Sequence, residues 1–198
     1  MSLSSLQADV TLDCKGLACP MPIIRTKKTI ESMDTGRVLA IEATDQGSLA
    51  DLQAWTRSMG HQYLGTIKEG TLQKHYVRKS SPDEGASPRK HAPTTPNDQL
   101  LAMMDAGESA FVILDVREPA EYAFGHIPGA VSVPLGKLET GIEELRSLYG
   151  GAEIHVVCRS GTRSDLACRL LAEYGFDRVW NVFPGMSEWE GPVERWIG

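Results

Sequence analysis

The sequence predicts two small domains, an α+β two-layer sandwich followed by an α/β domain built on a parallel sheet. Strand-like apolar runs alternate with helical patterns along most of the chain, which is typical of mixed folds. Residues 80–93 interrupt this alternation, because they contain three prolines and no periodic apolar positions. At 198 residues and 41% hydrophobic content, the chain has room for two ordinary globular domains on either side of a flexible linker.

The first domain is predicted over residues 9–79, in the order βαβαββ. Alternating patterns indicate strands at 10–13 and 38–43, and a glycine-containing turn at 68–70 joins strands at 61–67 and 71–77 into a hairpin. Helices are expected from about Pro20 to Gly36 and over residues 48–59. This order covers one face of a sheet with two helices. Residues 1–8 are expected to be disordered or vector-derived.

The second domain is predicted over residues 94–198. It should open with a helix that has Thr95 at its N-cap and Pro96 in its first turn. Nearly unbroken apolar strands at 111–115, 154–157 and 179–183 predict a parallel sheet with helices on both faces. Ligands of such sheets bind beyond the carboxyl ends of the strands, and Cys158 directly follows one of them.

The segment after Cys158 has the composition of an anion-binding loop between a strand and a helix that starts near Ser164. Its backbone N–H groups and the helix dipole favour a thiolate, and Arg159 and Arg163 add two positive charges. Gly161 can adopt the positive φ that closes the loop. Cys158 is therefore predicted to be a nucleophile, against the alternative of a buried cysteine at a strand end. The predicted substrate-binding residues are Arg159, Ser160, Gly161, Thr162 and Arg163.

The size of the loop favours sulfur over phosphate. Tyrosine-phosphatase-like loops place an arginine six positions after the cysteine, whereas Arg163 is the fifth residue after Cys158. The loop resembles the active loop of rhodanese domains, the single-domain sulfurtransferases. The resemblance extends over residues 115–122, 125–130 and 184–189, and departs from the family at Pro184, where a glycine is usual. It implies a rhodanese-like fold and a persulfide on Cys158.

Other polar residues of the second domain have two interpretations each. Asp115 and Arg117, followed by Glu118 and Glu121, either support the loop or form a solvated helix start. His126 invites a role as general base, but its His-Ile-Pro-Gly context is a turn and favours a structural role. Cys168 is expected to be half-buried packing on the helix after the loop.

A second candidate thiol is Cys19, which is expected at the N-cap of the first helix because Pro20 and Pro22 follow it. The helix dipole would favour its thiolate, or the residue is merely a small cap. Residues 12–22 contain Gly-Leu-Ala-Cys-Pro-Met-Pro and resemble the TusA/SirA family of small sulfur carriers, over roughly residues 9–79. The resemblance implies a persulfide on Cys19. Cys14 is either a resolving thiol or a small apolar residue.

Composition excludes several other classes of protein. The net charge of −6 argues against direct nucleic-acid binding. Residues 1–79 carry +2 and residues 94–198 carry −8, so the two halves attract each other weakly. No apolar run approaches the roughly 20 residues of a membrane span, and no signal peptide is recognised, so a cytoplasmic location is expected. The four cysteines are spread as in reduced proteins, and no metal-ligand spacing is found.

Together, these observations predict a sulfurtransferase that uses no cofactor other than a covalent persulfide. Cys158 would take sulfane sulfur from thiosulfate, glutathione persulfide or a similar small donor, and relay it to or from Cys19 and a downstream acceptor protein. Both thiols are expected to ionise near neutral pH. The alternatives are a phosphatase or arsenate reductase that uses the same loop, and a non-catalytic thiol protein for redox sensing or partner binding.

Overall fold

A computed structural model describes residues 6, 8–81, 84, 90, 91, 93–107 and 111–196. The chain forms two compact units that divide between Pro82 and Asp83. The predicted N-terminal segment 1–8 and linker 80–93 therefore lie largely outside the described residues. None of the helices in the described ranges is long and apolar enough to cross a membrane.

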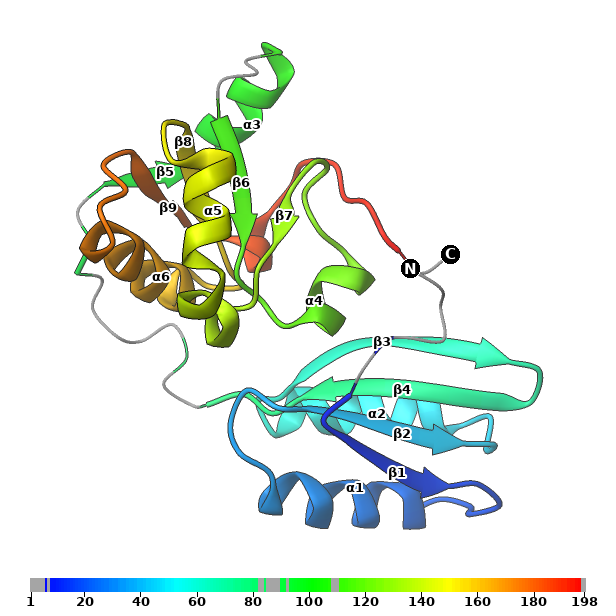
Figure 1. Ribbon diagram of the computed structural model, residues 1–198. Coiled ribbons are helices and arrows are strands. Elements are labelled where there is room, and N and C mark those ends of the chain that lie inside the picture. The colour runs from blue at the N-terminus through cyan, green and yellow to red at the C-terminus, as the bar shows by residue number, and fades with distance from the viewer. Residues whose placement is uncertain are drawn as a thin grey trace. The chain divides into compact units, whose positions relative to one another are not determined.

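The first unit is a four-stranded sheet with two helices on one face (Figure 1). Its elements are β1 (Val10–Cys14), α1 (Met21–Ser32), β2 (Val38–Ala43), α2 (Ser48–Ser58), β3 (Gln62–Glu69) and β4 (Leu72–Arg78). The strand order is β1-β2-β4-β3, with β1 parallel to β2 and the other pairs antiparallel. The βαβαββ order predicted from the sequence is confirmed.

The core of the first unit lies between this sheet and its helices. Leu39 and Ile41 of β2 lie on the same face of the sheet and pack with Ile30 of α1 and Leu52 of α2. Each of these four side chains is at most 1% exposed. The two-residue period of β2 and the apolar stripes of the helices thus place both helices on the same face of the sheet.

The second unit contains a five-stranded, entirely parallel sheet with the order β5-β9-β8-β6-β7. Its strands are β5 (Thr94–Pro96), β6 (Phe111–Asp115), β7 (Val131–Ser132), β8 (Glu153–Val157) and β9 (Val179–Phe183). Its helices are α3 (Asn97–Asp105), α4 (Pro119–Phe124), α5 (Ile142–Tyr149) and α6 (Thr162–Glu173), with short 3-10 turns at Leu135–Lys137, Glu139–Gly141 and Met186–Glu188.

Both faces of this sheet are covered by helices, as predicted. Leu114 and Val156 point to the face that α5 and α6 cover, whereas Ile113 and Val157 point to the face that α3 and α4 cover (Figure 1). Neighbours in sequence therefore belong to opposite cores, which explains why these strands are apolar at most positions. The carboxyl end of β8 leads directly into the Cys158 loop.

Three predicted helix starts differ from the structure. Thr95 lies in β5, where its hydroxyl bonds with His155 Nδ1 at 2.9 Å, so it cannot act as the N-cap of α3, which starts at Asn97. Pro20, not Cys19, is the N-cap of α1. Helix α6 starts at Thr162, two residues before the predicted Ser164, because Gly161 takes a φ of +84° and turns the chain into the helix.

The chain that enters the second unit is bound to it before β5 begins. The N–H groups of Lys90 and His91 both donate to Asp165 Oδ1 at 2.9 Å, and Pro93 O accepts a hydrogen bond from Asn181 N–H at 3.0 Å. The last residues of the predicted linker are therefore part of the second unit.

Candidate functional site

Cys158 lies at the end of β8, and its sulfur is held inside the loop. The N–H of Gly161 donates to Sγ at 3.2 Å, and the Ser164 hydroxyl lies 3.3 Å from the same atom. The cysteine has no exposed surface. Gly161 takes a positive φ, as predicted, and the ring of Phe183 packs directly against it. The loop thus places a backbone donor and a hydroxyl on one sulfur atom.

Asn181, a buried residue on β9, makes hydrogen bonds with both Ser164 and Gly161. The Ser164 hydroxyl lies 2.6 Å from Asn181 Oδ1, and Asn181 Nδ2 donates to the Gly161 carbonyl at 3.0 Å. A hydroxyl has one proton, so Ser164 donates either to Asn181 or to a negatively charged sulfur, but not to both. Sequence reasoning missed the roles of Ser164 and Asn181. The signal was a polar residue in the middle of the apolar strand at 179–183.

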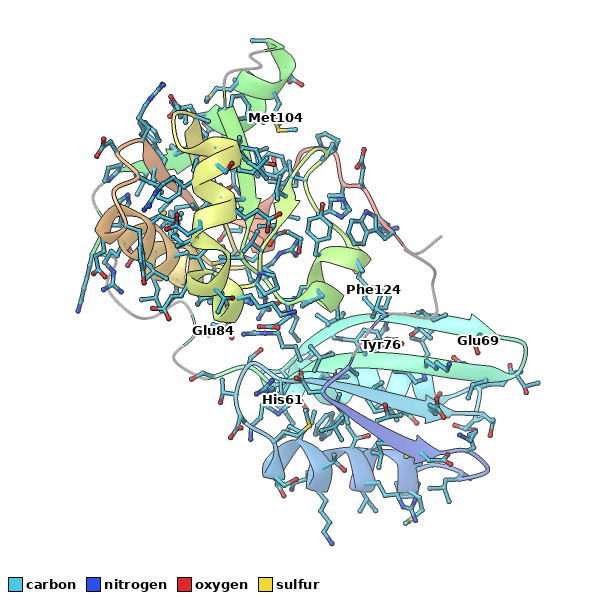
Figure 2. The ribbon with its side chains drawn as sticks, in the orientation of Figure 1. His61, Glu69, Tyr76, Glu84, Met104 and Phe124 are labelled. Atoms are coloured by element: carbon cyan, nitrogen blue, oxygen red, sulfur yellow. The ribbon has the colours of Figure 1, made fainter. Side chains whose placement is uncertain are left out.

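The two arginines of the loop have different environments. Arg163 donates to both carboxylate oxygens of Glu121, at 2.7 and 2.9 Å, and lies 3.5 Å from Glu84, which Figure 2 labels. Burial opposes its charge, but the Glu121 carboxylate raises the pKa of Arg163 overall. The positive charge predicted to attract the donor is thus compensated within the protein at Arg163.

Arg159 is the other cation of the loop, and it is half-buried. Among the described residues it has no ion pair, while its carbonyl accepts the Ser187 N–H at 2.8 Å. Ser160, the next residue, has a buried hydroxyl that makes no hydrogen bond to any residue that the structure describes. Both side chains are therefore available to an anionic ligand of the loop.

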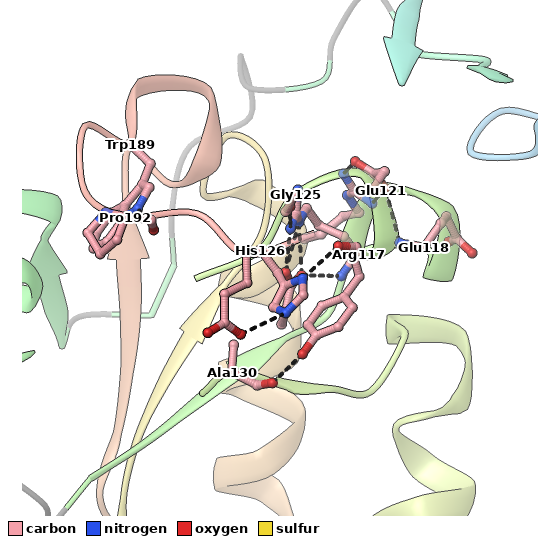
Figure 3. A network of polar contacts seen from close by, with 12 residues as sticks. Arg117, Glu118, Glu121, Gly125, His126, Ala130, Trp189 and Pro192 are labelled. Carbon is pink, nitrogen blue, oxygen red and sulfur yellow. Dashed lines mark hydrogen bonds and ion pairs between the residues drawn. The ribbon is translucent and has the colours of Figure 1, made fainter. Parts of the chain in front are cut away.

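Asp115 and Arg117 form a buried ion pair behind the loop. Arg117 Nε lies 2.9 and 3.0 Å from the two Asp115 oxygens, and its Nη2 donates to the Gly125 carbonyl at 2.7 Å (Figure 3). The two side chains are 0% and 5% exposed, so the interpretation as a solvated helix start is wrong for them. Glu118 and Glu121 form a capping box at the start of α4, which orients Glu121 toward Arg163.

The remaining candidates of the second unit are structural. His126 stacks on Tyr122 with 3.7 Å between the ring centres, and its Nδ1 bonds with the Tyr122 carbonyl at 2.8 Å, so Nδ1 carries a proton (Figure 3). Its Nε2 faces Glu194 at 3.7 Å. Cys168 is fully buried, not half-buried as predicted, and burial raises the pKa of its thiol.

Cys19 is an exposed thiol of the first unit, one residue before the N-cap of α1. A hydrogen bond to the Asp51 carboxylate raises the pKa of Cys19, and the nearby Asp45 charge acts in the same direction. The expectation that Cys19 ionises near neutral pH is therefore wrong. The main cause is Asp51, in the first turn of α2, whose carboxylate favours the protonated thiol.

Cys14 belongs to the core of the first unit, because it is 0% exposed and burial raises the pKa of its thiol. This location favours the small apolar residue over the resolving thiol. In the ranges that the structure describes, no three His, Cys, Asp or Glu side chains gather to hold a metal ion.

Comparisons with known proteins match both units. The family model for sulfurtransferase TusA matches residues 10–79, and the model for the rhodanese-like domain matches residues 96–192. The chain is 46% identical over 192 residues to "Putative sulfur carrier protein YrkF" of Bacillus subtilis (strain 168), an alignment that covers 96% of this chain and 100% of the relative.

Two shorter relatives from the same organism match parts of the chain. "Putative sulfur carrier protein YrkI" is 46% identical over 74 residues, which are 37% of this chain and 99% of YrkI. "Putative sulfurtransferase YtwF" is 42% identical over 95 residues, which are 48% of this chain and 87% of YtwF. The two domain families and the full-length relative support a role in sulfur transfer. The chain belongs to the family of proteins in which a TusA sulfur-carrier domain is followed by a rhodanese-like domain.

Proposed function

We propose that Cys158 takes sulfane sulfur from a small donor, thiosulfate or a low-molecular-weight persulfide, and exchanges it with the carrier thiol of Cys19. The observation that carries this proposal is the environment of Cys158 Sγ, which has the Gly161 N–H at 3.2 Å and the Ser164 hydroxyl at 3.3 Å. These donors stabilise negative charge on a sulfur atom, and Arg159 supplies a cation that no described carboxylate pairs with.

Loading of Cys158 is a thiol–disulfide type of exchange. The Cys158 thiolate attacks the outer sulfur of thiosulfate, a new S–S bond forms, and the S–S bond of the donor breaks. Sulfite leaves with the electron pair of that bond, and Cys158 becomes a persulfide. With a low-molecular-weight persulfide as donor, the leaving group is the corresponding thiolate. No external oxidant or reductant is needed in either case.

Transfer to Cys19 repeats the same chemistry. The sulfur of Cys19 attacks the outer sulfur of the Cys158 persulfide, and Cys158 leaves as a thiolate. Cys19 is mostly a thiol at neutral pH because its pKa is raised, so its proton must leave during the attack. The Asp51 carboxylate is the charged group that acts most strongly on this thiol, and it is the base placed to take the proton. The reverse transfer, from Cys19 to Cys158, uses the same groups.

Joining carrier and enzyme in one chain replaces a bimolecular encounter by an intramolecular one. The local concentration of one thiol at the other is then on the order of millimolar, if the connecting segment allows the two sites to meet. Both cysteines must stay reduced between cycles, which suits the cytoplasm. From Cys19, the sulfur would pass to an acceptor protein that attacks the persulfide with its own thiol.

The loop also argues against phosphatase or arsenate reductase activity. In a phosphate-binding loop the arginine must point its charge at the ligand, whereas Arg163 is bound to both oxygens of Glu121. A non-catalytic thiol protein would bind sulfur once without turning over, so the amount of sulfite released per protein separates that function from catalysis.

The test is to incubate the protein with thiosulfate, measure sulfite release, and map persulfides by mass spectrometry. In the unsubstituted protein, both Cys158 and Cys19 should be persulfidated and sulfite should exceed one equivalent when cyanide is the final acceptor. Cys158→Ser should abolish sulfur on both sites, whereas Cys19→Ser should leave Cys158 loaded. Cys168→Ala, which removes a core thiol only, is the matched control. Equal loading of Cys19 in Cys158→Ser would refute the relay.

A further inference from the structure

The core of the first unit contains a chain of polar side chains that sulfur transfer to Cys158 does not require. His75, on β4, is completely buried. Its Nε2 lies 3.0 Å from the Ser48 hydroxyl at the start of α2, and its Nδ1 lies 2.7 Å from the Tyr63 hydroxyl on β3. Thr66 joins the group through its hydroxyl, which bonds with Tyr63 and lies 3.0 Å from His75 Nδ1. Buried polar groups of this number need a reason.

The direction of the hydrogen bond between Ser48 and His75 follows from counting protons. The Ser48 hydroxyl donates its single proton to the Asp45 carbonyl at 2.6 Å, so it can only accept from His75. His75 therefore carries its proton on Nε2, and Nδ1 accepts from Tyr63, the closer of its two neighbours. The Thr66 hydroxyl bonds with Tyr63 and also lies 3.0 Å from Nδ1.

The ionisation states of the chain agree with this assignment. Burial, assisted by the Lys68 charge, lowers the pKa of His75 to about 4, so the imidazole stays neutral at physiological pH. Burial raises the pKa of Tyr63 to about 12, so its hydroxyl keeps the proton that it donates. The imidazole is therefore neutral with its proton on Nε2, and the chain of hydrogen bonds ends at the Asp45 carbonyl.

The hydrogen-bond chain ends at Asp45, in the segment that also carries the two carboxylates acting on Cys19. The Asp45 carbonyl also accepts the Ser48 N–H at 3.2 Å and Gln73 Nε2 at 3.3 Å. A β-carbon at Gly47 would lie 3.2 Å from Asp45 Oδ2 and 3.9 Å from Asp51 Oδ2, so both carboxylates gather over that glycine. Asp51 is the carboxylate that acts most strongly on the pKa of the Cys19 thiol, which it raises.

The loop before Cys19 is tied to the same segment. Gly16 N–H donates to the Thr44 hydroxyl at 2.9 Å, next to Asp45. The thiol and the carboxylate that faces it are thus supported from one short stretch, residues 44–51. The buried chain fixes that stretch to strands β3 and β4.

We infer that Ser48, His75 and Tyr63 are positioning residues for Cys19, because together they hold the turn that presents Asp51 to its thiol. The inference rests on the proposed carrier role of Cys19. The groups that act on the thiol are the Asp51 and Asp45 carboxylates, both of which favour its protonated form. Loosening the turn moves Asp51 away, so the thiol ionises more easily and loses its proton acceptor at the same time.

The test is the pH profile of Cys19 alkylation by iodoacetamide, read residue by residue by mass spectrometry on the full chain. His75→Phe and Ser48→Ala should shift the Cys19 midpoint to lower pH and leave the Cys158 profile unchanged. His75→Gln should keep the original profile, because its amide can both donate to Ser48 and accept from Tyr63. Thr56→Ala is the matched control, since Thr56 is 1% exposed on α2 and donates only within its own helix.

Two results would overturn the inference: an unchanged Cys19 midpoint in folded His75→Phe, or an equal shift in Thr56→Ala. Circular dichroism establishes that each variant is folded. If His75→Phe does not fold, Ser48→Ala decides, because that change removes the hydroxyl that links His75 to the Asp45 carbonyl, and an unchanged Cys19 midpoint there overturns the inference. Persulfide mapping on the same samples separates the two proposals: a shifted midpoint without any sulfur on Cys19 contradicts the carrier role alone.

Discussion

Glu121 and Arg163 meet through two hydrogen bonds, at 2.7 and 2.9 Å, between the start of α4 and the Cys158 loop. The pair is buried, with side chains 0% and 13% exposed. Glu121→Gln should leave Arg163 as a buried cation short of its main partner and lower the free energy of unfolding by about 3 kcal/mol. Urea unfolding followed by tryptophan fluorescence measures this change. Glu143→Gln breaks an exposed pair with Arg146 and should change stability by less than about 1 kcal/mol.

Arg159 should act mainly on donor binding. Its charge has no ion-pair partner among the described residues, so Arg159→Gln should raise KM for thiosulfate by on the order of tenfold, the equivalent of one charge-assisted hydrogen bond. The turnover number should change little, and the dependence of KM on salt should weaken. Arg159→Lys should recover part of the loss. A fall in kcat with unchanged KM would contradict this role.

Asn181 should act on Cys158 through its two partners in the loop. Asn181→Ala removes the hydrogen bonds to Ser164 and to the Gly161 carbonyl, so the Ser164 side chain and the peptide at Gly161 are no longer held in place around Sγ. Sulfur loading of Cys158 should slow by on the order of tenfold. In a double-mutant cycle with Ser164→Ala, the two effects should be less than additive, because they act through the same hydroxyl. Strictly additive effects of the two substitutions would show that Asn181 does not act through Ser164.

Asp51 should control both the charge and the reactivity of Cys19. Asp51→Asn removes the carboxylate that raises the pKa of Cys19, so the alkylation midpoint should move to lower pH. Loss of the negative charge should also accelerate the anionic reagent iodoacetate more than the neutral iodoacetamide. The ratio of the two rates isolates the electrostatic effect from that of ionisation. Asp34→Asn, on the same unit, is the control and should leave the ratio unchanged.

The stability of the first unit should depend on pH through His75. Its folded-state pKa of about 4 lies below the ordinary value of 6.5, so the unfolded chain binds the proton more readily. Stability is therefore complete above pH 6.5 and falls as the pH approaches 4, by on the order of 3 kcal/mol. His61, whose pKa burial also lowers, contributes in the same direction. Unfolding curves at pH 7 and pH 4.5 measure the loss, which should be smaller in His75→Gln.

Features carried by neighbouring residues were predictable from the sequence. The Cys158 loop, the positive φ of Gly161 and the strand at 111–115 follow from local pattern alone. The state of Arg163 did not follow, since its partner Glu121 lies 42 residues away and only the fold brings them together. The raised pKa of Cys19 did not follow from the sequence for the same reason. The local pattern shows that Cys19 precedes a helix, but only the fold brings Asp51 of the next helix to its thiol.

The contact between Phe183 and Gly161 restricts how this loop can be redesigned. A β-carbon at position 161 would lie 2.6 Å from the ring, and the φ of +84° is itself unfavourable for any other residue. Libraries that vary residues 159–163 will therefore recover glycine at 161, and a smaller residue at position 183 removes only the steric one of the two obstacles. The backbone conformation at position 161 thus sets a limit on the loop that no change of the neighbouring ring can lift.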